Sequence, residues 1–167
     1  MKIYTEITTT FDCSLERAFK SPMLCDVCQV HTGYGLTPRV THCEDDSTWG
    51  QIGGSRRIFM AKNIAFKGGE AALDTVLERI ENEYWKIEIT NVKSFSLGVH
   101  TFQGEWWTRE NEDGTTNVRY GYTMISDSIL LYPLQLFFTK VIWRHYMKQV
   151  VKNIKKLAYS KAPYLHD

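Results

Sequence analysis

The sequence has almost no net charge and no long uninterrupted apolar run. Its 167 residues include 20 lysines and arginines against 19 aspartates and glutamates, and the two signs are scattered along the chain. This balance predicts no binding to nucleic acid or to an acidic membrane. No stretch reaches the ~18 apolar residues of a membrane span, and the N-terminal segment lacks an apolar core of signal-peptide length. We therefore expect a cytoplasmic protein without a membrane span.

Several catalytic and nucleotide-binding motifs are also absent. The chain contains no GxxxxGK phosphate loop and no GxSxG nucleophile motif. Hydrolase and nucleotide-binding functions therefore have no support. Repeats, low-complexity segments and linker-like segments are missing as well, and 43% of the residues are hydrophobic. The chain can bury one sizeable core, and we expect a single domain over residues 1–167.

The chain has only four cysteines, and we expect them to be free thiols because no secretion signal is present. Cys25 and Cys28 form a CxxC pair, and His31 follows three residues later. These are zinc-ligand types at a compatible spacing. However, only one such pair exists, and it lies in a predicted short helix without a second pair. Small, partly buried thiols are the favoured interpretation, so we predict no metal and no cofactor.

The longest helical pattern runs from about Leu130 to Lys161, with Pro133 suited to its first turn. One apolar stripe with helical spacing is expected to grip a sheet, and Lys140 is its only polar residue. This first stripe contains Leu136, Trp143, Met147, Val150, Val151, Ile154, Leu157 and Ala158. A second stripe lies nearly opposite and contains Leu134, Phe137, Phe138, Val141, Ile142 and His145. The second stripe needs loops, a ligand, a second subunit or a membrane surface to cover it.

The rest of the chain shows two short helical patterns and seven strand patterns. The helices are expected at residues 15–20 and 22–30, and the strands at 2–11, 39–43, 55–63, 71–80, 84–93, 99–110 and 115–126.

A first predicted hairpin turns at residues 81–83, which pairs Glu78 with Lys86 across the strands. Strand alternation then sends the even-numbered residues, including Asp74 and Glu88, to solvent. The odd-numbered residues are expected to face the core, namely Leu73, Thr75, Leu77, Trp85, Ile87, Ile89 and Asn91.

A second predicted hairpin turns at residues 112–114, and its register places an aromatic set on the core face. The expected core pairs are Trp106 with Tyr120, Gly104 with Tyr122, and Phe102 with Met124; on the outer face Trp107 is opposite Arg119. His100 is even-numbered like Phe102, Gly104 and Trp106, so its side chain is also expected to face the core. Because glycine opposite an aromatic residue leaves room, we expect a cavity to begin at Gly104.

This order of elements resembles the START-like superfamily, also called SRPBCC or helix-grip proteins, in its polyketide cyclase/dehydrase and lipid-transport branch. Two local segments are similar to that family: Cys13-Ser-Leu-Glu-Arg-Ala-Phe19, and the glycine-bearing segment Trp49 to Arg57. The resemblance implies an α+β fold in which a curved seven-stranded antiparallel sheet surrounds a long C-terminal helix, with two short helices after the first strand. It also implies an apolar pocket for lipids, sterols, hormones or polyketides, and in some members cyclisation or dehydration.

Binding or transport of a small hydrophobic ligand is the leading hypothesis, with turnover left open. The predicted ligand-binding residues are Thr75, Trp85, Asn91, His100, Phe102, Trp106, Tyr120, Tyr122, Lys140, Trp143 and Met147. One alternative is a cyclase or dehydratase that uses His100 and Tyr122 as acid and base. Another is an interaction module in which Leu134, Phe137, Phe138 and Val141 form a homodimer or a membrane-surface patch.

Overall fold

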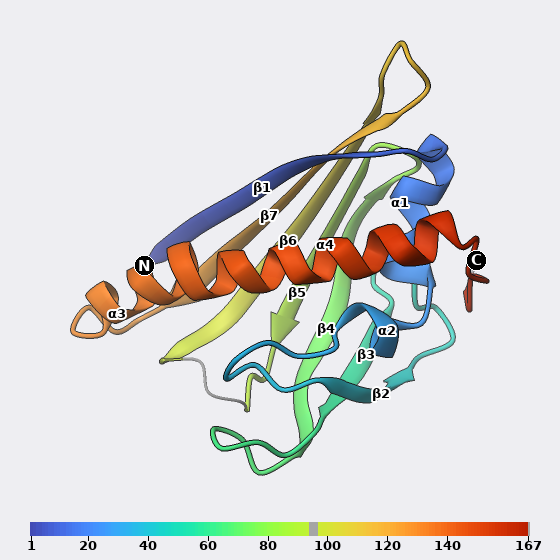
Figure 1. Ribbon diagram of the computed structural model, residues 1–167. Coiled ribbons are helices and arrows are strands. Elements are labelled where there is room, and N and C mark those ends of the chain that lie inside the picture. The colour runs from blue at the N-terminus through green and yellow to red at the C-terminus, as the bar shows by residue number, and fades with distance from the viewer. Residues whose placement is uncertain (94–96, 167) are drawn as a thin grey trace.

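The structure is a computed structural model that describes residues 1–93 and 97–166. Strand β1 opens the chain and is followed by two helices, six more strands and a closing helix in three segments (Figure 1). The bounds are β1 Lys2–Phe11, α1 Leu15–Leu24, α2 Val27–Val30, β2 Val40–Asp45, β3 Ser55–Met60, β4 Gly69–Ile80, β5 Tyr84–Thr90, β6 Val99–Glu110, β7 Thr116–Ser126, α3 Tyr132–Phe137, η1 Phe138–Trp143 and α4 Arg144–Tyr159.

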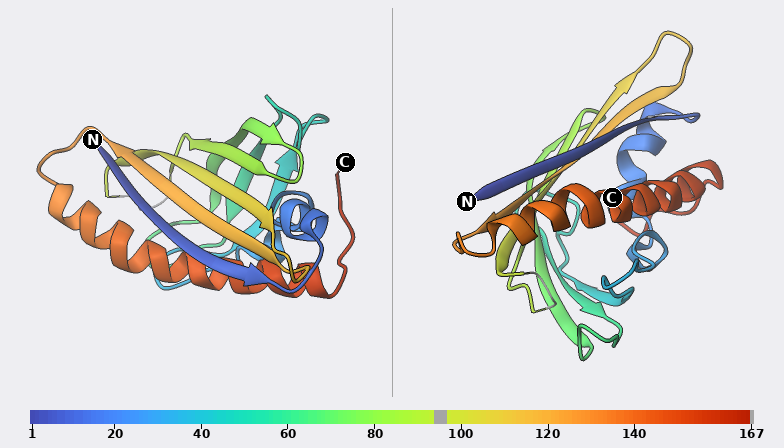
Figure 2. Two further views of the ribbon diagram at one scale, coloured as in Figure 1. Left: turned by 90° about the horizontal axis from the view of Figure 1, so that it is seen from above. Right: turned by 60° about the vertical axis from the view of Figure 1, so that its left-hand side comes forward.

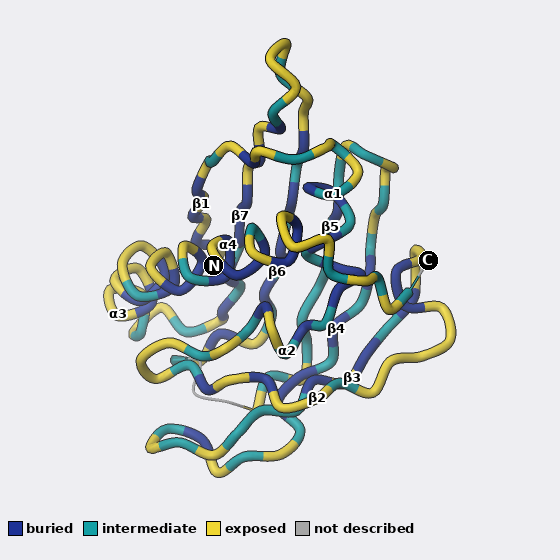
Figure 3. The backbone as a smooth tube through the Cα atoms, turned by 45° about the vertical axis from the view of Figure 1, so that its right-hand side comes forward, coloured by how far each residue is buried: buried dark blue, intermediate teal, exposed yellow. Residues whose placement is uncertain are grey.

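The seven strands form one antiparallel sheet in the order β1-β7-β6-β5-β4-β3-β2. The sheet curves around the closing helix, and α1 and α2 lie beside that helix (Figure 2). Buried and exposed residues alternate along the strands (Figure 3). The main core therefore lies between the concave face of the sheet and the helices. This arrangement confirms the predicted helix-grip fold.

Helix α1 contains a proline that the sequence pattern assigned to the start of a separate helix. Pro22 has no N–H group, so it cannot bond to the carbonyl of Ala18, four residues earlier. The indole nitrogen of Trp106 donates to that carbonyl instead, at 3.1 Å. The indole of Trp85 donates to the carbonyl of Phe19 at 2.9 Å. Side chains of the sheet thus satisfy the helix carbonyls near the proline, and α1 continues to Leu24.

The closing helix contains a π turn at Phe138–Trp143. This turn holds one residue more than a regular α-helical turn. Residues on the N-terminal side of the turn therefore face the sheet one position away from where a regular α-helix would place them. Leu136, predicted on the sheet side, is 37% exposed, whereas Gln135 and Thr139 are fully buried. The prediction for Leu136 was wrong because it assumed an uninterrupted α-helix.

The β4–β5 hairpin has the predicted pairing of Glu78 with Lys86, whose side chains form an ion pair at 3.4 Å. A bulge at Leu77 interrupts the register between this pair and Val76. Because an extra residue reverses the alternation of side chains, Ala72, Asp74 and Val76, which precede the bulge, face the core. The prediction that Asp74 faces solvent was therefore wrong, and it is 1% exposed.

The β6–β7 hairpin has the three predicted core pairs, and the Arg119 guanidinium lies 4.0 Å from the centre of the Trp107 ring on the outer face. A second bulge occurs at His100. Val99 pairs with Ser126 and takes the buried position, while His100 is exposed.

Candidate functional site

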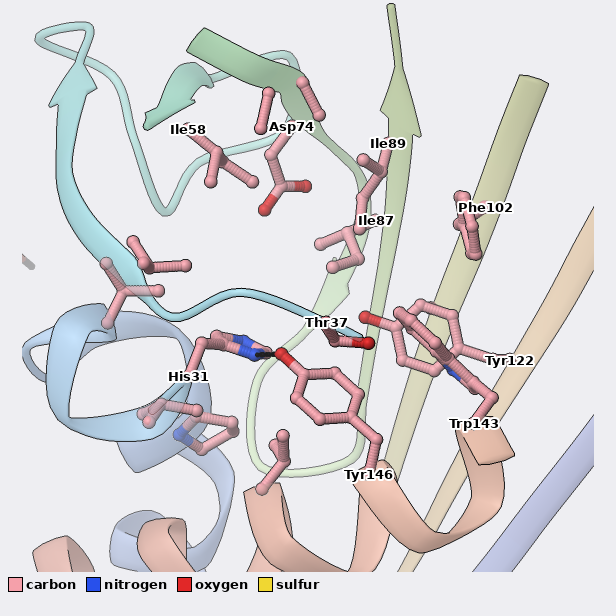
Figure 4. A pocket seen from close by; sticks show the side chains of 18 of the residues that line it. His31, Thr37, Ile58, Asp74, Ile87, Ile89, Phe102, Tyr122, Trp143 and Tyr146 are labelled. Atoms are coloured by element: carbon pink, nitrogen blue, oxygen red, sulfur yellow. Dashed lines mark hydrogen bonds between the residues drawn. The ribbon is translucent and has the colours of Figure 1, made fainter. Parts of the chain in front are cut away.

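A cavity lies between the inner face of strands β3 to β7, the closing helix, and α2 with the loop that follows it (Figure 4). The centre of a water-sized sphere can occupy about 110 Å³ of this space. A single water molecule needs about 10–15 Å³ by this measure, so the cavity has room for several waters or a small organic molecule. Leu36, in the loop after α2, lines the cavity and is itself exposed, which places an opening at that loop.

The walls are mostly aliphatic and aromatic. Ile58, Ile87, Ile89 and Phe102 extend into the cavity from β3, β5 and β6 (Figure 4). A Cβ atom at Gly104 would lie 3.0 Å from atoms of Ile87 and of Tyr122. The glycine therefore allows these neighbours to approach the sheet closely, rather than leaving an empty space above itself.

Trp143 from the closing helix forms an aromatic wall. Its ring centre lies 4.9 Å from that of Tyr146, 5.1 Å from that of Phe102 and 5.3 Å from that of Tyr122. The indole N–H of Trp143 is buried and has no acceptor among the described residues. The wall thus contains one unused hydrogen-bond donor.

A buried ion pair lies at the β3 and β4 side of the cavity. Arg56 and Asp74 are directly opposite each other in the sheet, and a guanidinium nitrogen lies 3.2 Å from Oδ2 of Asp74. The Arg56 guanidinium also stacks 3.9 Å from the centre of the Trp49 ring. Burial raises the pKa of Asp74, and the charge of Arg56 opposes this effect. Oδ1 of Asp74 has no partner among the described residues, and the carboxylate points into the cavity (Figure 4).

His31 and Tyr146 form a second polar pair, with 2.6 Å between Nδ1 and the hydroxyl oxygen. Burial lowers the pKa of His31 to about 3, and the nearby charge of Arg56 adds to this effect. Burial also raises the pKa of Tyr146. Both groups are therefore neutral near pH 7, which suits hydrogen bonding to a ligand better than proton transfer.

The sequence pattern indicated only a possible zinc-ligand role for His31, and Tyr146 was not among the predicted ligand-binding residues. Residue 146 lies three positions after Trp143 in the closing helix, so helical spacing could have placed its side chain on the same face. The hydrogen bond with His31 joins residues 115 positions apart and could not have been predicted from local pattern.

Six of the predicted ligand-binding residues line the cavity: Trp85, Phe102, Trp106, Tyr120, Tyr122 and Trp143. The other five do not line it. Bulges turn Thr75 and His100 to the outer face, and Asn91 is exposed in a turn with a positive φ of 52°. Lys140 is exposed within the π turn, and Met147 is fully buried in the core outside the cavity wall.

The predicted acid and base, His100 and Tyr122, lie on different sides of the sheet. Tyr122 lines the cavity, whereas His100 contacts Thr101 at 2.9 Å and Asp127 at 3.5 Å on the surface. The catalytic pairing of His100 with Tyr122 was therefore wrong, because it assumed a strand without a bulge.

The CxxC segment has no metal-site geometry. Burial raises the pKa of Cys25 and of Cys28, and the Cys25 thiol lies 3.8 Å from the Ala162 carbonyl oxygen. Within residues 1–93 and 97–166, no three histidine, cysteine or acidic side chains converge as metal ligands.

In the same part of the chain, no helix is both long and apolar enough to cross a membrane.

The second helix stripe is largely exposed. Leu134, Phe137 and Val141 face solvent, but Phe138 is only 5% exposed and lines the cavity. Phe138 cannot contribute to a dimer surface, and the shift in winding at the π turn accounts for its inward direction.

No known family model and no curated protein sequence matches this chain. Solved structures do match it. Ara h 8.0201 has a TM-score of 0.72 at 13% identity, covering 96% of this chain and 99% of that one. A protein of unknown function from Staphylococcus aureus, SA2116, has a TM-score of 0.72 at 15% identity, covering 96% of both chains. A point mutant of norcoclaurine synthase from Thalictrum, in complex with a transition-state analogue, has a TM-score of 0.70 at 7% identity, again covering 96% of both chains. At these identities the likeness shows the fold alone, and the fold is the predicted helix-grip fold.

Proposed function

We propose that the protein binds a small, mostly apolar ligand in the cavity between its sheet and its closing helix. The observation that carries this proposal is an open space whose walls are isoleucine and aromatic side chains. The two buried charged groups in its wall, Arg56 and Asp74, are paired with each other, and His31 and Tyr146 are neutral, so a mostly apolar molecule meets no unpaired charge there. The similar fold of a synthase solved with a transition-state analogue supports a small-molecule site in this architecture.

A cavity-filling substitution tests the proposal. Ile87 is on the inner face but only partly buried, because it borders the open space. Ile87→Trp is expected to fill that space and to abolish binding while the fold is kept. Ile80→Trp, at an exposed position of the neighbouring strand β4, is the matched control and is expected to bind normally.

Binding is measured by displacement of a fluorescent apolar probe with a panel of fatty acids, sterols and polyketide-like aromatics, together with native mass spectrometry of the gently purified protein. Wild-type protein and the Ile80 variant should bind members of the panel that the Ile87 variant does not bind. Equal binding by all three proteins, or no binding by any of them, would contradict the proposal.

Binding without turnover is the form of the function that the polar groups favour. His100 lies outside the cavity, and the cavity histidine, His31, is held neutral by burial. A general base works best with a pKa near the operating pH, and the pKa of His31 lies well below that range.

A further inference from the structure

Two buried polar atoms in the cavity wall have no partner among the described residues. One is the carboxylate oxygen Oδ1 of Asp74, which can only accept a hydrogen bond when the group is ionised, and the other is the indole N–H of Trp143, which can only donate. Both side chains are at least nine-tenths buried, and Figure 4 shows the Asp74 carboxylate directed into the cavity. Buried polar groups are nearly always hydrogen-bonded to protein or to water, so a molecule that fills the cavity and excludes water must supply the partners of these two atoms.

The charges at the cavity restrict that molecule further. The negative charge of Asp74 is balanced by Arg56, which forms both the ion pair and two hydrogen bonds to Oδ2. An ammonium or carboxylate group on the ligand would therefore bring an unbalanced charge into a buried site, which is strongly unfavourable.

We infer that the ligand is a neutral apolar molecule with a hydroxyl group that donates to Oδ1 of Asp74 and with an oxygen atom that accepts from the indole N–H of Trp143. This inference rests on the proposed ligand-binding function and narrows it to neutral alcohols and phenols. The apolar part of the ligand lies against Ile58, Ile87 and Ile89, its hydroxyl group lies at the ion pair, and its acceptor oxygen lies at the indole.

Three probes of nearly the same shape test the inference by calorimetry: 2-naphthol, 2-methoxynaphthalene and naphthalene. The ether can accept but not donate, and the hydrocarbon can do neither. Because a hydrogen bond to a charged group is strong, 2-naphthol is expected to bind wild-type protein about tenfold or more tightly than the ether. The ether is expected to bind more tightly than naphthalene, because it keeps the acceptor for Trp143.

Two variants assign these preferences to the two residues. Replacing the ion pair by Arg56→Met together with Asp74→Leu keeps a buried apolar pair, a type of exchange that proteins often tolerate. This double variant is expected to bind 2-naphthol and the ether equally. Trp143→Phe should remove the preference of the ether over naphthalene, whereas the matched control Trp107→Phe, on the outer face, should keep it.

The possible outcomes separate the inference from the proposed function. If the wild-type protein binds all three probes with equal affinity, the alcohol inference is overturned and ligand binding stands. If it binds 2-naphthoate or 2-naphthylammonium more tightly than 2-naphthol, the neutral-ligand inference is overturned. If no probe and no member of the lipid panel binds, the proposed function itself is wrong. The probe series on wild-type protein decides these points even where a variant fails to fold.

A separate surface carries a second inference. The segment from Ile129 to Val141 exposes seven large apolar side chains, and Leu130 and Phe137 are 89% and 57% exposed. We call this surface the apolar front; it consists of Ile129, Leu130, Tyr132, Leu134, Leu136, Phe137 and Val141. An exposed apolar surface of this extent on a soluble domain usually marks an interaction site.

The charges around the apolar front indicate what covers it. Lys140, Arg144 and Lys148 are exposed along the same helix, and the sequence has no aspartate or glutamate between Asp127 and Asp167. The net charge of +1 for the whole chain conceals this local excess of positive charge. A second copy of the chain would bring like charges together, whereas an anionic lipid surface would offer both opposite charge and an apolar layer. We propose that the apolar front docks on anionic membranes.

Vesicle flotation tests this docking with phosphatidylcholine alone and with added phosphatidylglycerol. Binding is expected only with the anionic lipid, and it should weaken at high salt. Phe137→Ser, and Lys140→Gln with Arg144→Gln, are each expected to weaken binding about tenfold or more. The matched controls, Ile64→Ser and Lys62→Gln with Lys67→Gln, change exposed residues of the β3–β4 loop and should bind as wild type. Salt-independent binding, no binding to either vesicle, or a homodimer that persists in light scattering and is broken by Phe137→Ser would overturn the proposal.

Discussion

At the scale of single residues, the burial of His31 in the cavity wall makes the stability of the protein depend on pH. The pKa of an unfolded histidine is near 6.5, and burial lowers that of His31 to about 3. Between these values the unfolded chain takes up a proton that the folded protein does not. The contribution of His31 to stability is therefore complete above pH 6.5 and decreases as the pH falls toward 3.

We predict that lowering the pH from 6.5 to 5 reduces the free energy of unfolding by on the order of 1–2 kcal/mol through this residue. The measurement is urea denaturation of wild-type protein and of His31→Gln at both pH values. The variant should lose less stability than the wild type over this range, whereas the control His100→Gln, at the surface, should behave as wild type. An equal pH dependence in wild type and His31→Gln would show that His31 is readily protonated in the folded state.

At the scale of secondary-structure elements, the π turn decides which side chains of the closing helix support the sheet. Gln135 is buried and donates from Nε2 to the Ser126 hydroxyl at 2.7 Å and to the Leu97 carbonyl at 2.9 Å. The neighbouring Leu136 is partly exposed. A regular α-helix would favour the opposite assignment, with leucine buried and glutamine in solvent.

We predict that Gln135→Ala lowers the free energy of unfolding by about 2 kcal/mol, because it removes two buried hydrogen bonds and leaves a small void. Leu136→Ala should cost less than about 1 kcal/mol, as is usual at exposed positions. Denaturant unfolding of the two variants makes the comparison. A larger loss for Leu136→Ala would mean that the helix is regular in solution.

At the scale of the whole molecule, the sheet and the closing helix depend on each other. The closing helix buries eight large apolar side chains, namely Phe138, Trp143, Tyr146, Met147, Val150, Val151, Ile154 and Leu157. At the lower value of about 1.5 kcal/mol for each, their burial contributes on the order of 12 kcal/mol. This is as large as the entire stability of a typical domain, about 5–15 kcal/mol.

We therefore predict that a chain ending at Leu131 has no stable fold. Its near-ultraviolet circular dichroism should be lost, and it should bind a dye that recognises exposed apolar surface. Cooperative thermal unfolding of this truncated chain would contradict the prediction and would show that the sheet has a core of its own.

Local pattern in the sequence determined most of the elements and the hairpin registers near each turn, and the order of those elements resembled that of the helix-grip fold. Strands β1 and β6 have the predicted bounds, and six aromatic residues of the predicted site line the cavity. These features follow from the alternation of side chains and from helical spacing, which depend only on near neighbours in the chain.

The tertiary structure alone decided where the polar chemistry lies. Single-residue bulges at Leu77 and His100 reversed the direction of the Asp74 and His100 side chains. The π turn buries Gln135 and leaves Leu136 exposed, the opposite of what regular helical spacing predicts. A one-residue irregularity in a strand or helix cannot be seen in the composition of the segment, but it redirects every side chain on one side of it. Such irregularities are stabilised by contacts between distant segments, so spacing along the chain cannot reveal them.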